Sequence, residues 1–320
     1  MKKILHSLPA GALAACCLAA LPLGGRAAEA PAEKPSLEFT TAGDMRSFTE
    51  NTKPDGKRFF DGVCAAMQRA GPGSFLISPG DFDPPAANRA IIDRYLGKDF
   101  LWYIVVGNHE VENAAVMPWV HDWLAADIPH VVRRGLPGTK LTLYSWDFGN
   151  SHFVAIDTYP WAKAGSPGTT GDKGKVDVTE EEFKWIEDDL AASHQPFLWV
   201  TGHQPIESRP DMDRTEGVRH ENDSVSYDAA RSARFVALLK QYHVRAYICG
   251  HTHNTSVVKL GGGVWQCDSG HARGGGTSAS TASASSFLKF RIVGDQPFVD
   301  IYRGDPKGVD YTLRKTVELN

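Results

Sequence analysis

The chain has 320 residues and a formal net charge of −4 at pH 7, and 42% of its residues are hydrophobic. This length and composition suit one large globular domain. An acidic chain of this kind is a poor candidate for binding nucleic acid or an anionic membrane, so we expect neither partner.

The N-terminus has the layout of a secretory signal peptide, with Lys2 and Lys3 before an Ala- and Leu-rich stretch that ends in small residues. We expect cleavage after Ala27, which removes residues 1–27 with three positive charges and lowers the net charge from −4 to −7. The apolar run is shorter than the roughly 20 residues that cross a bilayer, and no later segment is long enough either. We therefore predict a periplasmic or secreted protein without a membrane span; the competing hypothesis is a lipoprotein anchored at Cys16.

Three cysteines remain after this cleavage, namely Cys64, Cys249 and Cys267. An odd number leaves at least one thiol unpaired within the chain, which excludes a disulfide framework. Cys249 and Cys267 both fall in predicted strands and are candidates for a disulfide in an oxidising compartment. We favour buried free thiols, because unpaired cysteine is among the most buried residue types.

Strand-like runs alternate with helical patterns in the first half of the mature chain, which is typical of a layered α/β fold. In chain order we expect a strand at 37–42, a helix at 57–70, a strand at 75–78, a helix at 86–96, a strand at 101–106 and a helix at 113–126. Residues 141–147 and 152–157 then predict two strands joined at Gly149-Asn150 in a hairpin-like connection.

The clearest helix of the second half begins at Thr179, which has capping-box spacing with Glu182 and precedes a stripe of Phe183, Ile186 and Leu190. We expect this helix to extend to residue 192. The later predicted elements are a strand at 197–200, a helix at 229–242, and strands at 246–249, 257–260, 264–267, 287–293 and 298–302.

Two stretches, 162–175 and 274–286, are rich in small and polar residues and lack apolar periodicity, so we predict surface loops there. Neither is expected to be a domain linker, because the strands after the second stretch have too little apolar surface to form their own core. No internal repeat is present. Residues 28–320 are therefore predicted to be a single domain.

Five short polar clusters directly follow predicted strands, and each begins with glycine. They are residues 43–46 (Gly-Asp-Met-Arg), 80–83 (Gly-Asp-Phe-Asp), 107–110 (Gly-Asn-His-Glu), 202–205 (Gly-His-Gln-Pro) and 250–253 (Gly-His-Thr-His). In open α/β sheets ligands bind at the carboxyl ends of strands, and glycine lets the chain turn sharply there. Five strand ends can thus bring their side chains to one site.

The side chains of these clusters suit a metal ion. Asp, Asn and His without thiolates are ligands for borderline ions such as Zn²⁺, Mn²⁺ or Fe, and they argue against a structural thiolate zinc site. Taken singly, each Gly-Asp pair is explained by an ordinary turn, Asn108 by a helix cap, and His203 by a hydrogen-bonded loop histidine. His251 and His253 are more specific, because imidazoles two residues apart face one pocket only if the chain leaves the strand pleat. The same order of strand, glycine and ligand in all five clusters favours a metal site.

The five clusters together resemble the ordered motifs of the calcineurin-like metallophosphoesterase superfamily: D-x-H, G-D, G-N-H-E/D, a later G-H and a final G-H-x-H. Residues 107–110 and 250–253 are the most specific matches, and the resemblance covers most of the mature chain. It implies an α/β fold, a four-layer α/β/β/α sandwich of two mixed sheets, with a binuclear metal centre at the carboxyl ends of the strands.

The resemblance also implies which residues hold the two metal ions. They are Asp44, Asp81, Asn108, His203, His251 and His253. Asp44, Asp81 and His253 would hold the first ion, and Asp81 would bridge to the second. The ions would be divalent or of mixed valence, and Mn, Zn and Fe remain open.

The chain departs from the family pattern at two positions. Arg46 stands where the first motif usually has a histidine ligand, and Pro84 stands where purple acid phosphatases have a tyrosinate ligand, so we expect no purple site. Some relatives also have a carboxylate at the position of Pro84 that orients the catalytic histidine, and Asp83 is the neighbouring candidate for that role. Arg46 has no lone pair to give a metal ion, so it either acts on substrate phosphate or pairs with a surface carboxylate such as Glu50.

The implied reaction is direct in-line attack of a metal-bound hydroxide on phosphorus, without a covalent intermediate. His109 is the candidate that protonates the leaving alkoxide; the alternative is that it only orients a ligand. Arg46 and His271 are the candidate substrate-binding residues. Other cationic side chains in polar loops are more readily explained as solvated surface, namely Arg209, Arg214, Arg219 and His220.

We therefore predict a metallophosphoesterase, a phosphoric ester hydrolase, and favour a phosphomonoesterase acting on a small-molecule phosphate ester. One alternative is a phosphodiesterase acting on nucleotide or lipid-headgroup diesters. Another is a degenerate, non-catalytic phosphate-binding module, which the arginine at position 46 makes credible. No protein partner is predicted.

Overall fold

The computed structural model describes residues 34–46, 59–136, 141–159, 177–214, 217–273, 284–305 and 310–320. The predicted signal peptide and the alternative acylation site at Cys16 lie outside these ranges, and so do the predicted loop 162–175 and residues 274–283 of the second predicted loop. Among the described residues, none of the helices combines the length and apolar character that a bilayer crossing requires.

The first sheet has six strands in the order β13-β12-β11-β1-β2-β3. Its parallel part consists of β1 (Leu37–Thr41), β2 (Phe75–Pro79) and β3 (Leu101–Val105). Its antiparallel part consists of β11 (Ser286–Val293), β12 (Gln296–Gly304) and β13 (Tyr311–Glu318). Because β1, β2 and β3 run the same way, their carboxyl ends lie along one edge of the sheet.

The second sheet has seven strands in the order β4-β5-β6-β7-β8-β10-β9. Its parallel strands are β6 (Ser151–Ala155), β7 (Phe197–Thr201), β8 (Ala246–Cys249) and β10 (Trp265–Ser269). Its antiparallel strands are β4 (Val131–Arg134), β5 (Tyr144–Phe148) and β9 (Thr255–Lys259). The predicted hairpin is present, since β5 pairs with β6 across Gly149-Asn150.

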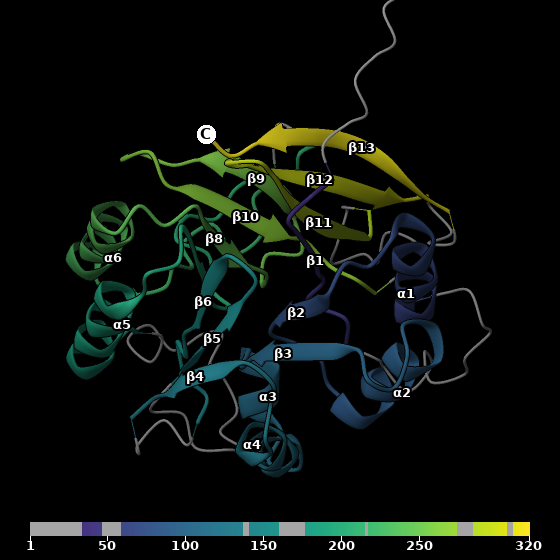
Figure 1. Cartoon of the computed structure of the whole chain (residues 1–320), viewed down its shortest axis with the longest axis horizontal. Helices are drawn as coiled ribbons and strands as arrows, with labels where there is room; N and C mark the ends of the chain where they lie inside the picture. The colour runs from purple at the N-terminus through teal and green to yellow at the C-terminus, as the bar shows by residue number, and fades with distance from the viewer. Residues whose placement is uncertain are drawn as a thin grey trace, which may run out of the picture. The chain divides into compact units, whose positions relative to one another are not determined.

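Helices lie on the outer faces of both sheets (Figure 1). The first sheet carries α1 (Phe59–Ala70), α2 (Pro85–Tyr95) and α4 (Val116–Ala125), and the second carries α5 (Glu180–Ala192) and α6 (Ala229–Gln241). A short helix, α3 (Asn108–Glu112), follows β3 directly. The predicted four-layer α/β/β/α sandwich of two mixed sheets is confirmed.

Aromatic side chains fill the space between the two sheets. Phe39 of β1 meets Phe153 of β6 and Trp199 of β7 edge to face, with ring centroids 5.2 and 5.5 Å apart. Phe75 of β2 meets the same Phe153 ring at 5.3 Å. Edge-to-face pairs contribute about 0.5–1.5 kcal/mol each beyond the burial of their area, so this layer stabilises the packing of one sheet on the other.

The predicted cap and stripe of α5 are confirmed. The Thr179 hydroxyl accepts the Glu182 N–H at 3.1 Å, and the Glu182 carboxylate accepts the Thr179 N–H at 2.8 Å, which satisfies two N–H groups at the helix start. Phe183, Ile186 and Leu190 are buried against the second sheet. Their burial holds α5 on the outer face of that sheet.

Cys64, Cys249 and Cys267 are buried free thiols, as favoured from the sequence. Cys249 of β8 is paired in register with Asp268 and Cys267 of β10 with Ile248. The two cysteines are thus one position out of register on neighbouring strands. Successive side chains of a strand point to opposite faces, so these sulfur atoms face different cores and form no disulfide.

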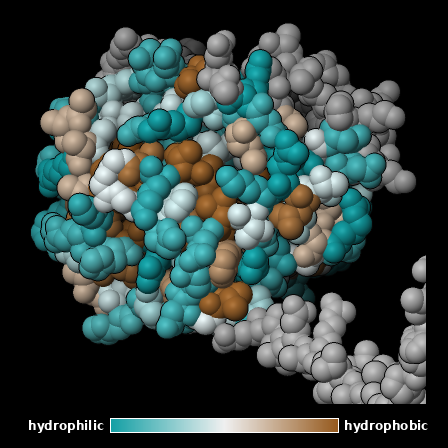
Figure 2. All heavy atoms as spheres, turned by 90° about the horizontal axis from the view of Figure 1, so that it is seen from above, coloured by the Kyte–Doolittle hydropathy of each residue, from teal (hydrophilic) through white to brown (hydrophobic). Residues whose placement is uncertain are grey.

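Three elements were missed by the sequence analysis. The predicted helix 113–126 begins later, at Val116, and is preceded by the separate helix α3. The other two missed elements, β4 and β13, are edge strands of their sheets. Among the described residues, the large hydrophobic side chains that are exposed lie on these two strands: Val132 on β4 and Leu313 on β13. Figure 2 shows one face of the molecule, on which hydrophilic residues surround smaller apolar areas. Edge strands are often short or charged, so their apolar pattern is weak.

Candidate metal centre

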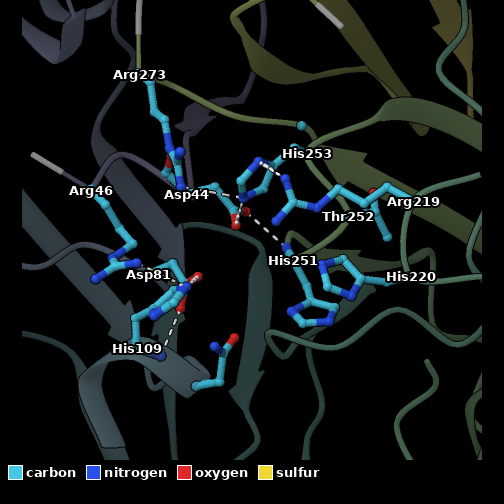
Figure 3. Close-up of polar contacts among 12 residues, drawn as sticks. Asp44, Arg46, Asp81, His109, Arg219, His220, His251, Thr252, His253 and Arg273 are labelled. Atoms are coloured by element: carbon cyan, nitrogen blue, oxygen red, sulfur yellow. Dashed lines mark hydrogen bonds and ion pairs between the residues drawn. The ribbon is translucent and has the colours of Figure 1, made fainter. Parts of the chain in front are cut away.

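The six predicted metal ligands come together where parallel strands of the two sheets end. Asp44 follows β1, Asp81 follows β2 and Asn108 follows β3, while His203 follows β7. His251 and His253 follow β8. All six are buried, with at most 3% of each residue exposed. Figure 3 shows the side chains of Asp44, Asp81, His251 and His253 directed toward a common centre.

The backbone leaves the strand geometry at four of these residues. Asp44, Asp81, His251 and His253 have positive φ angles of 51°, 57°, 71° and 59°. For residues with a side chain, such conformations cost on the order of 1–3 kcal/mol each and are concentrated at functional sites. The turn out of the pleat allows both histidines of the last cluster to face the same side.

Four of the five glycines that precede the ligands have no room for a side chain, and Gly80 and Gly250 are two of them. A Cβ on Gly80, whose φ is +91°, would lie 2.2 Å from Nδ1 of His203, and one on Gly250 would lie 2.5 Å from Oδ2 of Asp44. Both values are far below any ordinary contact between heavy atoms. Glycine at these positions therefore lets one loop approach the ligands of another.

The position of the proton on His203 follows from its contacts. Nδ1 lies 2.7 Å from the carbonyl oxygen of Pro79, which can only accept, so Nδ1 carries the hydrogen. The Nε2 atom of the neutral ring then has a lone pair. It is directed at Oδ1 of Asn108, 3.2 Å away, and Oδ1 of Asp81, 3.4 Å away.

His251 is held in the opposite tautomer. Its Nε2 lies 2.7 Å from a carboxylate oxygen of Asp223 and so donates a hydrogen, which leaves the lone pair on Nδ1. Burial lowers the pKa of His251 to about 4, so the ring is neutral at pH 7. Nδ1 lies 3.2 Å from Nε2 of His203. In the neutral form of both rings, two nitrogen lone pairs face each other at this distance, and a shared cation would stabilise that arrangement.

The carboxylates of the centre also favour a cation. Asp44, Asp81 and His203 each place a ligand atom within 4.8 Å of the others. Burial, together with the nearby Asp44, raises the pKa of Asp81 well above its ordinary value. Burial and the neighbouring Asp81 also raise the pKa of Glu110, to about 8. A metal ion would offset this repulsion, so the residues present fit a metal site.

Glu110 has a structural role that the sequence analysis did not assign. Its carboxylate accepts the N–H groups of Asp81, Phe82 and Gly107, each at 2.8 Å. It therefore ties the loop after β2 to the start of α3. This explains the acidic residue after Asn108 and His109: it fixes the backbone that presents two of the predicted ligands.

The first metal position differs from the second in its neighbours. Nε2 of His253 lies 3.1 Å from Oδ1 of Asp44, and the other Asp44 oxygen accepts the His251 N–H at 2.8 Å. On the far side of the ring, Arg219 places a guanidinium nitrogen 2.7 Å from Nδ1 of His253. Arginine can only donate, so Nδ1 accepts and the proton of the neutral ring is on Nε2.

Arg46 lies inside the site. It forms a two-point ion pair with Asp83, at 2.6 and 3.2 Å, and another of its guanidinium nitrogens lies 3.0 Å from Nε2 of His109. The predicted alternative partner, Glu50, lies outside the described residues. Asp83, which was considered for orienting His109, contacts Arg46 instead.

The carboxylate that orients His109 is Glu112. Its Oε2 atom lies 2.8 Å from Nδ1 of His109, three residues earlier in α3, while Nε2 of His109 lies 3.5 Å from Oδ2 of Asp81. Burial and the adjacent Arg46 lower the pKa of His109 to about 4. The i, i+3 spacing of His109 and Glu112 on a helix is the sequence signal that marks this pair.

Asp223 was not predicted as a site residue, and no local sequence pattern indicates its role. One of its oxygens accepts from His251 at 2.7 Å and lies 3.1 Å from Nδ1 of His220, while the other accepts the Tyr227 hydroxyl at 3.1 Å. Burial tends to raise the pKa of Asp223, but the contacts with His220 and His251 outweigh it and hold the pKa below its ordinary value. The carboxylate is therefore ionised and fixes the His251 tautomer.

The remaining predicted side chains divide between the site and the surface. His271 is buried, and its ring centroid lies 5.9 Å from that of His253. Arg219 reaches the site, as described above, and Arg273, two residues after His271, also does so although it was not predicted. Four cationic side chains were expected on the surface. This is confirmed for Arg209, which pairs with the exposed Glu207, and for Arg214, which is exposed. It is wrong for Arg219 and for His220, which lies 3.1 Å from Asp223.

Comparisons with known proteins agree with this geometry. Residues 48–255 match the model of the family described as calcineurin-like phosphoesterase. The tartrate-resistant acid phosphatase type 5 of Mus musculus is 26% identical over 183 residues, which cover 54% of this chain and 48% of that protein. The chain thus spans about half the length of this curated relative.

Two solved structures share the fold. A dimetal phosphatase from Danio rerio aligns over 90% of this chain and 99% of its own, with a TM-score of 0.57 and 13% sequence identity. GAP50, the anchor in the inner membrane complex of Plasmodium, aligns over 89% of this chain and 88% of its own, with a TM-score of 0.53 and 16% identity. At these identities the likeness concerns the fold alone.

Proposed function

Because the chain belongs to the calcineurin-like phosphoesterase family, we propose that it hydrolyses phosphate esters with metal ions held by the six clustered side chains, and that its substrates are phosphomonoesters. The facing lone pairs of His203 Nε2 and His251 Nδ1, 3.2 Å apart, carry the metal assignment. Asn108 and Asp81 direct oxygen atoms at the same point.

Six residues would hold two ions, with Asp81 between them. Asp44 and His253 would complete the first position, and Asn108, His203 and His251 the second. Such ions lower the pKa of a bound water toward neutrality and neutralise charge on the phosphoryl oxygens. The absence of thiolates among these ligands leaves Mn, Zn and Fe as candidates.

His109 is the proposed proton donor to the leaving group. Its ring lies at the rim of the centre, with 21% of its side chain exposed, and Nε2 faces the Asp81 carboxylate. Glu112 accepts from Nδ1 at 2.8 Å and so stabilises the protonated ring, whereas the nearby Arg46 opposes it. An anion that draws the Arg46 guanidinium toward itself would reduce this opposition.

Arg46 and His271 are the proposed substrate contacts carried over from the sequence. Arg46 is positioned by Asp83 on one side and lies beside His109 on the other, so its guanidinium is near the site of proton transfer. His271 lies behind His253 and is almost fully buried, which suits it to support that ring as well as to meet a phosphate oxygen.

Two observations favour a second candidate, the non-catalytic phosphate-binding module. Arg46 has replaced a metal ligand, and the lone pair of His253 is held by Arg219 in this structure. Both features weaken the first metal position. A chain that kept only the second ion would bind phosphate with little hydrolysis.

Parallel hydrolysis assays with an aryl phosphate and a bis-aryl phosphate, each with and without added Mn²⁺ or Zn²⁺, test the proposal. We expect metal-dependent hydrolysis with the monoester preferred, and two ions per chain by elemental analysis. Preference for the bis-aryl ester would indicate a phosphodiesterase. Hydrolysis of neither ester under any metal condition, with phosphate still bound, would indicate the binding module.

A further inference from the structure

Two arginines from separate loops converge on the first metal position. Arg219 lies in the loop between β7 and α6 and contacts Nδ1 of His253 at 2.7 Å. Arg273 follows β10; its Nε donates to the backbone carbonyl of Asp44 at 3.3 Å, and its terminal nitrogen lies 3.5 Å from Nε2 of His253. Figure 3 shows Arg219 and Arg273 approaching the Asp44 and His253 pair from different sides, with Arg46 beside Asp81 and His109.

These guanidinium groups are partly removed from water and close enough to repel one another. Arg219 and Arg273 both contact the buried ring of His253, and Arg273 also contacts the backbone of Asp44. The buried carboxylates of Asp44 and Asp81 offset this positive charge. Once metal ions neutralise those carboxylates, the excess of positive charge favours an anion of more than one charge at this place.

The contact between Arg219 and His253 depends on the state of the metal position. A neutral imidazole has one lone pair, and here that lone pair accepts from Arg219. A metal ion held by Nε2, the nitrogen beside Asp44, would leave the hydrogen on Nδ1. Arg219 could then no longer donate to the ring, and its guanidinium would be within reach of an anion at the centre.

We propose that Arg219 and Arg273 form a binding site for the non-esterified oxygens of a doubly charged terminal phosphate, and that this site selects phosphomonoesters over diesters. A monoester presents three such oxygens and a charge near −2, whereas a diester presents two and a charge of −1. The planar donor fork of arginine matches phosphate oxygens in pairs. This inference rests on the proposed function, because it assigns the substrate class of the same centre.

Equilibrium binding of inorganic phosphate and of dimethyl phosphate to the metal-loaded protein tests the site, since the second probe is a singly charged diester. The variants are Arg219→Gln, Arg273→Gln and the double variant, with Arg209→Gln as the control because Arg209 pairs with Glu207 at the surface of the same loop. We expect each single variant to bind phosphate about 10-fold more weakly and the double variant about 100-fold, the usual worth of charge-assisted hydrogen bonds. Dimethyl phosphate should change by less than about 3-fold.

Metal titration of the same variants separates phosphate binding from a structural role. Removing Arg219 takes a cation and a competing donor from His253, so the affinity of the first metal position should stay the same or rise while phosphate affinity falls. A purely structural arginine would lower both affinities together. Arg219→Lys and Arg273→Lys, which keep the charge, should retain part of the phosphate affinity even if a Gln variant folds poorly.

The outcomes for this site and for the proposed function are distinct. If the double variant binds phosphate as tightly as wild type, or loses both probes equally, the arginine site is wrong even if ester hydrolysis is confirmed. If no ester is hydrolysed but phosphate affinity still depends on both arginines, the site stands and the proposed hydrolysis fails.

Discussion

Asp223 offers a sharp test of how the second metal position is built. Its carboxylate accepts from Nε2 of His251 at 2.7 Å and from the Tyr227 hydroxyl at 3.1 Å. Through the first contact it keeps the His251 lone pair on Nδ1, which faces Nε2 of His203. Replacing Asp223 should therefore weaken a metal ion that it never touches.

The magnitude follows from what each substitution keeps. In Asp223→Asn the amide oxygen can still accept from His251 and the amide nitrogen can donate to the Tyr227 oxygen, so the tautomer survives and only the charge is lost. In Asp223→Ala both are lost, and His251 can adopt either tautomer. Removing the hydrogen-bond partner of a metal-binding histidine lowers metal affinity by about 10- to 100-fold. We therefore expect the free energy of metal binding to weaken by about 1.4 kcal/mol in the Asn variant and by about 2.7 kcal/mol in the Ala variant.

Calorimetric titration of the metal-stripped protein with Zn²⁺ or Mn²⁺, with elemental analysis of bound metal, measures this effect. Tyr227→Phe is the control, because it removes only one hydroxyl contact and should change metal affinity by less than about 3-fold. Thermal unfolding of the metal-stripped forms checks that each variant folds. Wild-type affinity at both metal positions in a well-folded Asp223→Ala would show that the carboxylate does not set the state of His251.

Four further predictions concern other residues. His109→Ala should lower turnover by about 10²-fold with metal content nearly unchanged, most for substrates with poor leaving groups; an equal loss for all leaving groups would contradict the role of proton donor. Asp81→Asn should weaken both metal positions together, and two tightly bound metals with normal activity would show that Asp81 is not the bridge. Arg46→His should raise occupancy of the first position while Arg46→Ala mainly raises KM; no kinetic change in the Ala variant would exclude a substrate contact. Burial and the nearby Asp157 raise the pKa of Glu182 from 4.5 to about 8. Between these pH values the folded state holds a proton that the unfolded state has lost, so the free energy of unfolding should fall as pH rises, by up to about 1.4 kcal/mol per pKa unit. Denaturant unfolding at pH 5 and 8 should show a smaller fall for Glu182→Gln than for wild type, and an equal fall would refute the assignment.

Local patterns in the sequence were sufficient to predict the fold class and to predict that the ligand side chains would lie close together. The alternation of strands and helices indicated the layered α/β architecture, and the stripe and cap of α5 were read from a few residues of adjacent turns. The glycine before each donor indicated a sharp turn at the strand end. Since parallel strands end along one edge, the sequence also predicted that Asp44, Asp81 and the histidines would meet.

The edge strands could not be predicted in the same way. In β13 the exposed residues are mostly polar or charged, so the run lacks the alternation that marks a half-buried strand. Strand β4 has four residues and pairs with β5 through a register shift. Their pairing depends on the neighbouring strand, which a local window of sequence does not contain.

The chemistry of the histidines was decided only by the tertiary structure. A sequence motif names an imidazole but does not say which nitrogen carries the proton. For His203 that is set by the Pro79 carbonyl, 124 residues away along the chain, and for His253 by Arg219, 34 residues away. The sequence therefore determined which side chains meet at the strand ends, because strand direction and glycine turns are local. The tertiary structure decided which lone pairs face the centre and which cations surround it, because hydrogen-bond partners far apart in the chain become neighbours only after folding.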